Sequence, residues 1–273
     1  MRRRTSITLR QVVLVAMAVV SLYPVWFVLQ TALKTNVDYT LSPTGLPTHP
    51  TLHSLRSVLL DLPVPRWALN SAIVTVSSVC ITTFVAMLAA YAIVFSTMRG
   101  RNLLLSSNLV LMVIPPVALL IPMFVLMVDI GLINSLTSVI VFYSGLMVPF
   151  SVFFFVNFFR QFPRELVEAA TVDGAGPFKT LRLVVLPISA VATFTLVIVN
   201  AIWVWNELLI ALVFLQDENR RTLMAGLTLF QGRYATNQPL VLAGVLISIL
   251  PVILVYLAGQ RFFVRGMTAG IGR

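Results

Sequence analysis

Long apolar runs separated by short polar stretches dominate the chain. Six runs are about 20 residues or longer, the length of helix that crosses a bilayer, and they cover residues 12–33, 71–97, 103–128, 134–159, 184–214 and 239–262. Within lipid, only helices and closed barrels satisfy their backbone hydrogen bonds. The pattern therefore predicts an all-α membrane protein with six transmembrane helices. We expect one integral membrane domain over 1–273, with 12–33 as the first span and 67–262 as a five-span core.

Composition agrees with this interpretation, because hydrophobic residues make up 59% of the chain and charged residues 10%, against roughly a quarter charged in soluble domains. The basic start "MRRR" resembles a signal peptide, but the apolar run after it is long and no small-residue cleavage site follows. The first run is therefore expected to remain as a span. Cys80, the only cysteine, excludes a disulfide framework.

The net charge of +10 reflects topology rather than nucleic-acid binding. Lys and Arg accumulate on cytoplasmic loops. With six spans, one side would hold 13 of the basic residues, namely Arg2, Arg3, Arg4, Arg10, Arg99, Arg101, Arg160, Arg164, Lys179, Arg182, Arg261, Arg265 and Arg273. The other side would hold 6, namely Lys34, Arg56, Arg66, Arg220, Arg221 and Arg233. This asymmetry predicts that both termini are cytoplasmic.

A polar segment, residues 160–187, interrupts the apolar pattern between the fourth and fifth runs. Acidic residues early in its first half, the pair Asp173-Gly174 and then Pro177 predict two short helices joined by a glycine turn. Leu166, Ala169 and Ala170 would share one small apolar face of the first helix. Such a face docks into a groove on another protein or lies on lipid as an amphipathic helix, and the pattern leaves both open.

The same segment resembles the EAA motif of binding-protein-dependent ABC importers. The matching positions are Glu168-Ala169-Ala170, Gly174, the aliphatic Val184 where Ile is usual, and Leu186-Pro187. The stretches "RWALNS" (66–71), "GLINS" (131–135), "WNE" (205–207), "TLMAGLTLF" (222–230) and "QRFFVRGMTAG" (260–270) are similar to the carbohydrate branch. Within that branch they resemble in particular the second membrane subunit of maltose-type importers.

This resemblance implies a permease with the MetI-like fold of type I importers, in a bacterial or archaeal cell membrane. The implied partners are a second homologous permease, two ATPase subunits that bind ATP and Mg, and an extracytoplasmic binding protein, with no nucleic acid. The implied cargo is a mono-, di- or oligosaccharide. Residues 160–187 would be the coupling loop, and its implied ATPase-coupling residues are Glu168, Ala169, Ala170, Asp173, Gly174, Leu186 and Pro187. In the family a tail similar to 265–273 reaches toward the ATPases.

The chain itself is not expected to be an enzyme or to hold a cofactor. No GxxxxGK[ST] phosphate-binding loop occurs, because the only lysines are Lys34 and Lys179. His49 and His53 flank Pro50 without an acid at ligand spacing, so no metal site is predicted.

The fifth run carries the candidate translocation-path residues. They are Trp205, Asn206 and Glu207, with Trp203 nearby. Aromatic faces and hydrogen-bonding groups suit sugars, but the same residues also suit an interfacial belt and contacts between helices. An acid at membrane depth is typical of ion-coupled secondary transporters as well. That class stays open as an alternative, as does an ABC permease for a glycerol phosphate ester or a polyamine.

Overall fold

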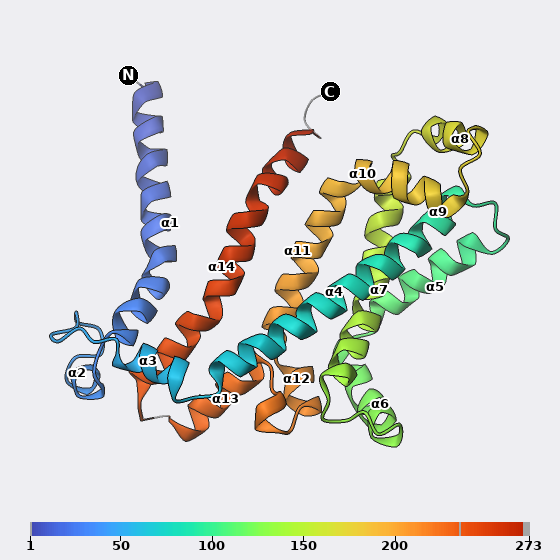
Figure 1. The fold of residues 1–273 in the computed structure, drawn as a ribbon. Helices are drawn as coiled ribbons and strands as arrows, with labels where there is room; N and C mark the ends of the chain where they lie inside the picture. Colours follow the sequence, from blue (N-terminus) through green and yellow to red (C-terminus); the bar gives the residue numbers. More distant parts are fainter. Residues whose placement is uncertain (1, 235, 270–273) are drawn as a thin grey trace. The chain divides into compact units, whose positions relative to one another are not determined.

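The computed structural model describes residues 2–234 and 236–269, and every regular element in this part of the chain is helical (Figure 1). The all-α prediction is confirmed. The elements are α1 (Arg2–Ala32), α2 (Asn36–Leu41), α3 (His53–Leu60), α4 (Val64–Phe95), α5 (Arg101–Val113), α6 (Pro116–Asp129), α7 (Leu136–Phe159), α8 (Arg164–Val172), α9 (Pro177–Thr180), the π-helix η1 (Leu181–Val185), α10 (Leu186–Ile188), α11 (Ala190–Asn206), α12 (Leu209–Phe214), the 3₁₀ helix η2 (Glu218–Arg220), α13 (Leu223–Arg233) and α14 (Gln238–Ala269).

Three helices are long and apolar enough to cross a membrane unbroken, over Arg10–Ala32, Val64–Phe95 and Leu136–Phe159. The predicted span 103–128 is instead two helices, α5 and α6, bent by 97°. Ile114 and Pro115 are both extended at the bend, with ψ 119° and ψ 135°. A residue before proline is driven out of the helical region, so the Pro115-Pro116 pair places the break.

The predicted fifth span, 184–214, also differs from the structure. The segment Pro177–Ile188 meets α11 at an 80° bend, so Leu186 and Pro187 lie before the bend and do not open the span. Helix α11 ends at Asn206, and Glu207 is extended with ψ 128° before α12 begins. The sixth run falls in α14, whose apolar stretch is Gln238–Leu254.

The described residues divide into two compact units, one from residues up to 68 and from 226–251, the other from 69–225 and from 252 onward. In the first unit, residues 53–60 form the short helix α3. Helix α2 was not predicted, although its start has a recognisable cap: the Thr35 hydroxyl accepts a hydrogen bond from the Asp38 N–H at 3.1 Å.

A buried lysine organises the loop after α2. Lys34 Nζ donates to the carbonyls of Ser42 at 2.8 Å and Pro43 at 3.1 Å. The Asp38 carboxylate accepts from the Thr48 N–H at 2.9 Å and from the Thr48 hydroxyl at 2.6 Å. These four bonds fix a proline-rich segment that has few backbone hydrogen bonds of its own to hold it.

The first unit also contains a close approach between helices. The Trp67 ring packs edge-on against Phe230, with ring centroids 6.0 Å apart. A Cβ on Gly226 would lie 2.2 Å from Cε3 of Trp67, which is closer than atoms can pack. The motif stretches that hold Trp67 and Gly226 therefore meet face to face, and only glycine fits at this point.

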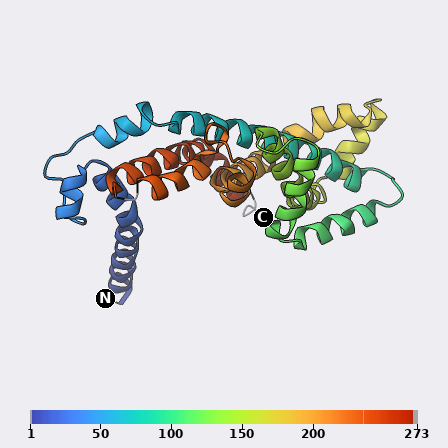
Figure 2. The ribbon, with the colours of Figure 1, turned by 90° about the horizontal axis from the view of Figure 1, so that it is seen from below.

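The second unit has two apolar cores at opposite ends. Phe142, Tyr143, Phe214 and Leu215 belong to the one where α6, α7 and α12 meet. The other lies near the EAA segment, defined as residues 160–187, and includes Phe155, Phe159, Leu181 and Val185. Helix α5 lies alongside α7 in both views (Figures 1 and 2). Helix α7 thus runs through both cores and links the two ends of the unit.

Candidate functional site

The EAA segment is two helices joined by a tight glycine turn, as its sequence predicts (Figure 1). Helix α8 ends in a Schellman motif: the Ala175 N–H donates to the Ala170 carbonyl at 2.9 Å, and the Gly174 N–H to the Thr171 carbonyl at 3.0 Å. Gly174 has φ +76°, a left-handed conformation that side chains with a Cβ rarely adopt. Pro177 then starts α9 at its first helical position.

One face of α8 is held by the chain and the other is open. Val167 packs against the apolar core below it, whereas Glu168 and Ala169 are exposed and Leu166 is 43% exposed. Glu168 makes no ion pair or hydrogen bond within the part of the chain that the structure describes. The helix is thus anchored from beneath and leaves the EAA residues accessible. Whether they contact an ATPase stays a prediction.

The second half of the segment is anchored through buried side chains. Leu181 and Val185 of η1 enter the core that contains Phe155 and Phe159 of α7. The Phe95 ring of α4 lies 5.9 Å from the Phe159 ring and 6.1 Å from the Phe162 ring, measured between centroids. These side chains form one continuous apolar contact, called here the apolar bed, that attaches the segment to α4 and α7.

Two hydroxyl groups hold the backbone on either side of the π-helix. Thr180, which is buried, donates to the Gly176 carbonyl at 3.2 Å. Ser189, also buried, donates to the carbonyls of Val185 at 2.7 Å and Leu186 at 3.2 Å. The Val185 carbonyl also accepts from the Ser189 N–H at 2.9 Å, so the Ser189 hydroxyl is a second donor to Val185 and also reaches the Leu186 carbonyl at the bend. π-Helical turns are frequent at functional sites.

Glu207 occupies the break between α11 and α12. Its carboxylate accepts from the Ile210 N–H at 3.0 and 3.1 Å and from the Ala211 N–H at 3.3 Å, which caps α12. The hydroxyl of the buried Tyr143 of α7 also donates to Glu207 Oε2. Glu207 is therefore a cap and a tie to a neighbouring helix rather than an isolated acid in a span.

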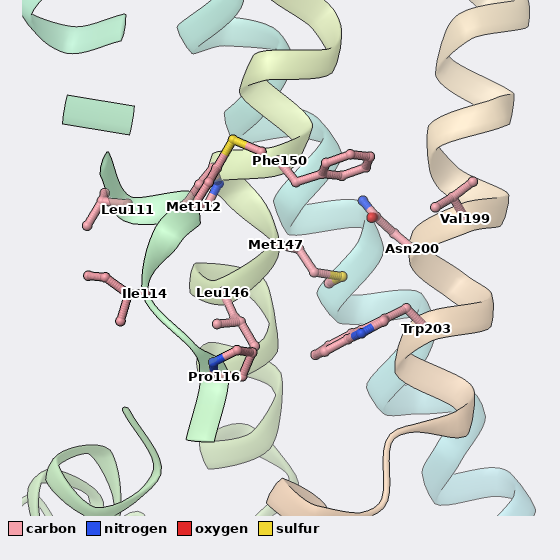
Figure 3. Close-up of a pocket in the computed structure, with 11 residues that line it drawn as sticks. Leu111, Met112, Ile114, Pro116, Leu146, Met147, Phe150, Val199, Asn200 and Trp203 are labelled. Atoms are coloured by element: carbon pink, nitrogen blue, oxygen red, sulfur yellow. The ribbon is translucent and has the colours of Figure 1, made fainter. Parts of the chain in front are cut away.

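A cavity of about 350 Å³ lies between the α5–α6 bend, α7 and α11 (Figure 3). Trp205, Asn206 and Glu207 do not line it. Asn206 is exposed and its amide donates to the Ile202 carbonyl of its own helix at 2.7 Å. The polar and aromatic lining comes instead from Phe150, Asn200 and Trp203. Asn200 is only 3% exposed and donates to the Ser151 hydroxyl at 3.0 Å.

A family model described as the binding-protein-dependent transport system inner membrane component matches residues 82–268. The chain belongs to this family. The sulfoquinovosyl glycerol transport system permease protein SmoH of Agrobacterium fabrum is 35% identical to this permease over 250 residues, 91% of the permease and 88% of SmoH. The melibiose/raffinose/stachyose import permease protein MelC of Bacillus subtilis is 30% identical over 273 residues and 99% of each chain.

Solved structures share the fold of the permease. A chain of a bacterial ABC transporter involved in the import of the acidic polysaccharide alginate has a TM-score of 0.82 and 25% identity, over 95% of the permease and 97% of that chain. The MetNI methionine ABC transporter in an inward-facing conformation has a TM-score of 0.55 at 19% identity, a likeness of fold alone. Three predictions are confirmed: the family, the similarity to permeases of sugar importers, and the MetI-like fold.

Sequence reasoning missed two features of the site in this permease. Asn200 is the only Asn within the apolar stretch 190–205 and lies three residues before Trp203. The two therefore share a helix face, and their common position in the cavity wall could have been predicted. The partnership of Glu207 with Tyr143 could not, because the two are 64 residues apart. The end of the C-terminal tail, 270–273, lies outside the described residues.

Proposed function

We propose that the chain is a permease subunit of an ATP-driven sugar importer and that the EAA segment transmits movement from a separate ATPase to the membrane helices. One observation carries the proposal: α8 is fixed to its own bundle through Val167 yet presents Glu168 and Ala169 to solvent. A helix that is packed against its own bundle on one face and exposed on the other suits docking of a partner. Relatives that import saccharides or a sugar glycoside support the class of cargo.

The proposed assembly contains this chain, a second homologous permease, two ATPase subunits and an extracytoplasmic binding protein. ATP and Mg would be bound by the ATPases. The structure has three unbroken candidate spans and two bent pairs that would bring the number to five. The six spans expected from the sequence, with more Lys and Arg on the side that would hold the EAA segment, support a topology with both termini cytoplasmic, in a bacterial or archaeal cell membrane. One integral membrane domain, with a five-span core over 67–262, remains the proposed organisation.

In the proposed mechanism, Glu168 binds the ATPase through charge-assisted hydrogen bonds. Ala169 and Ala170 permit close packing, and Asp173 and Gly174 form the turn that sets the direction of α9. Leu186 and Pro187 then join the segment to the bend before α11. Movement of the ATPase would reach α7 through the apolar bed under η1, and α11 through the bend at Ser189.

The test is co-purification of the tagged chain from detergent-solubilised membranes. We expect an ATPase and a second permease to accompany the wild type, and the ATPase alone to be lost from Glu168→Lys. Asp129→Lys is the matched control, because it reverses an exposed acid at the end of α6, away from the EAA segment. Retention of the ATPase by Glu168→Lys, or its equal loss from the control, would contradict the coupling site.

A further inference from the structure

The cavity at the α5–α6 bend combines unused polar groups with an aromatic surface. Asn200 Nδ2 is bonded to Ser151, but Asn200 Oδ1 accepts no hydrogen bond from the described residues. The Trp203 indole N–H likewise has no acceptor among them, and the ring is 39% exposed. Figure 3 shows the Asn200 amide and the Trp203 ring reaching from α11 toward the space that Met147 and Phe150 border from α7.

A bent helix borders the same space. Met112, Ile114 and Pro116 line it from the α5–α6 bend, where the helix is interrupted by 97°. Interrupted helices in membrane proteins are tolerated where they are buried in protein or line a water-filled cavity, and in secondary transporters such helices form substrate sites near the midplane. The bend therefore gives a reason, independent of Asn200 and Trp203, to expect a solute in this cavity.

We propose that this cavity is a solute subsite that binds one neutral pyranose unit, which rests on the sugar-import function proposed above. The apolar face of the ring would stack on Trp203, a hydroxyl would donate to Asn200 Oδ1, and a second oxygen would accept from the Trp203 N–H. The volume of about 350 Å³ falls at the lower end of the range of about 300–1,000 Å³ for ligand pockets.

The lining also sets the charge of the unit that is bound. Among the described residues, no ionisable side chain lines the cavity: the walls they form are aliphatic, aromatic, methionine, proline and one asparagine. A carboxylate or sulfonate placed there would lose water without gaining a counter-charge, which is costly in an apolar site. The subsite therefore accepts a neutral saccharide unit and rejects an acidic one.

The first test is uptake by proteoliposomes that contain the complete complex co-purified with the tagged chain. The neutral probes are radiolabelled raffinose and maltotriose, and the acidic probe is trigalacturonate. We expect uptake of a neutral probe, a rise of about tenfold in its KM for Trp203→Ala and Asn200→Ala, and a smaller rise for Trp203→Phe, which keeps a stacking surface.

Asn206→Ala is the matched control, because Asn206 lies on the same helix and is exposed outside the cavity. Its KM is expected to equal that of the wild type. If the wild type imports a saccharide and the Asn200 and Trp203 variants behave like this control, the subsite is wrong while the importer stands. If the wild type takes up no saccharide at all, the proposed function itself fails.

The second test distinguishes a cavity that is filled with water and accessible to sugar from one that is filled by a lipid acyl chain. In a Cys80→Ser background, which removes the only native cysteine, Phe150→Cys is treated with a neutral, water-soluble methanethiosulfonate reagent. We expect labelling that saturating raffinose or maltotriose slows about fivefold or more. Leu104→Cys on the exposed surface of α5 is expected to show no protection. Absence of labelling at position 150 would mean a lipid-filled cavity and would overturn the proposal.

Discussion

Tyr143 of α7 donates a hydrogen bond to the carboxylate of Glu207, the residue that separates α11 from α12. The carboxylate also accepts three contacts from backbone N–H groups at the start of α12. One acid therefore joins three helices at this end of the second unit. The competing hypothesis of an ion-coupled transporter requires the same acid to release and bind protons during each cycle.

Glu207→Gln is expected to keep at least half of the ATP-driven uptake, because the amide oxygen can still accept from Tyr143 and from the α12 backbone. Uptake measured with and without a protonophore checks this. Complete loss of transport in Glu207→Gln, together with wild-type uptake that depends on the proton gradient, would favour the ion-coupled class.

Tyr143→Phe tests the hydrogen bond between Tyr143 and Glu207 directly. Removing a hydrogen bond to a charged group costs about 1.5–3 kcal/mol, so we expect a lower thermal unfolding temperature of the purified complex. Tyr23→Phe, on the exposed surface of α1, is the control and is expected to leave the unfolding temperature unchanged. Equal unfolding temperatures for both variants would show that the bond contributes nothing to stability.

Gly174 and Gly176 form a matched pair for testing the turn of the EAA segment. Gly174 has φ +76°, whereas Gly176 has φ −68°, and a Cβ on either would meet open space. Gly174→Ala is therefore expected to destabilise the turn by about 1 kcal/mol through backbone strain alone, and Gly176→Ala to be neutral.

The bulkier pair extends the test to coupling. Gly174→Asp is expected to reach the membrane but to lose uptake, while Gly176→Asp retains it. Immunoblots of membranes and uptake by whole cells measure the two properties. Normal uptake by Gly174→Asp would refute the role assigned to the turn.

Ser189 is expected to keep the bend before α11 rigid. In Ser189→Ala the carbonyls of Val185 and Leu186 lose their side-chain donor, at a cost of about 1 kcal/mol. We expect fewer solute molecules transported per ATP hydrolysed, with assembly unchanged. Thr195→Val is the control, since the Thr195 hydroxyl makes the same kind of bond, to the Val191 carbonyl at 2.9 Å, on a straight part of α11. An unchanged transport ratio in Ser189→Ala would argue against a mechanical role.

Asp38 is expected to make the loop after α2 sensitive to acid. The hydrogen bond from the Thr48 hydroxyl lowers the pKa of the Asp38 carboxyl, and the Thr48 N–H and the Lys34 ammonium lower it further, against the opposing effect of burial. Because the pKa is lower in the folded state, the stabilisation is present above the unfolded value of about 3.9 and is lost as the pH falls through the folded value.

Thermal unfolding between pH 3 and pH 7 measures this effect. Asp38→Asn is expected to flatten the part of the pH dependence below about pH 4. The control Asp61→Asn, at an exposed position, is expected to leave the pH dependence unchanged. A wild-type profile that matches Asp38→Asn throughout would contradict the assignment.

Local signals made much of the EAA segment predictable. Gly174 after an acid-rich first turn and Pro177 at a helix start act through their own backbone preferences, so the sequence suffices to place α8 and α9. The 97° bend at Pro115-Pro116 was not predicted, because a proline only favours a kink and whether the helix breaks completely depends on what surrounds it. The end of α11 was hidden inside an apolar run, since Glu207 breaks the helix with help from Tyr143, which is distant in sequence.

The 80° bend between Pro177–Ile188 and α11 has a geometric consequence for any force applied to the EAA segment. A displacement along the axis of Pro177–Ile188 is nearly perpendicular to the axis of α11. It therefore exerts a torque on the end of that helix instead of sliding it along its length. Small displacements at one end of α11 would then become lateral excursions farther along the helix, at the level of Asn200 and Trp203, without breaking hydrogen bonds within it.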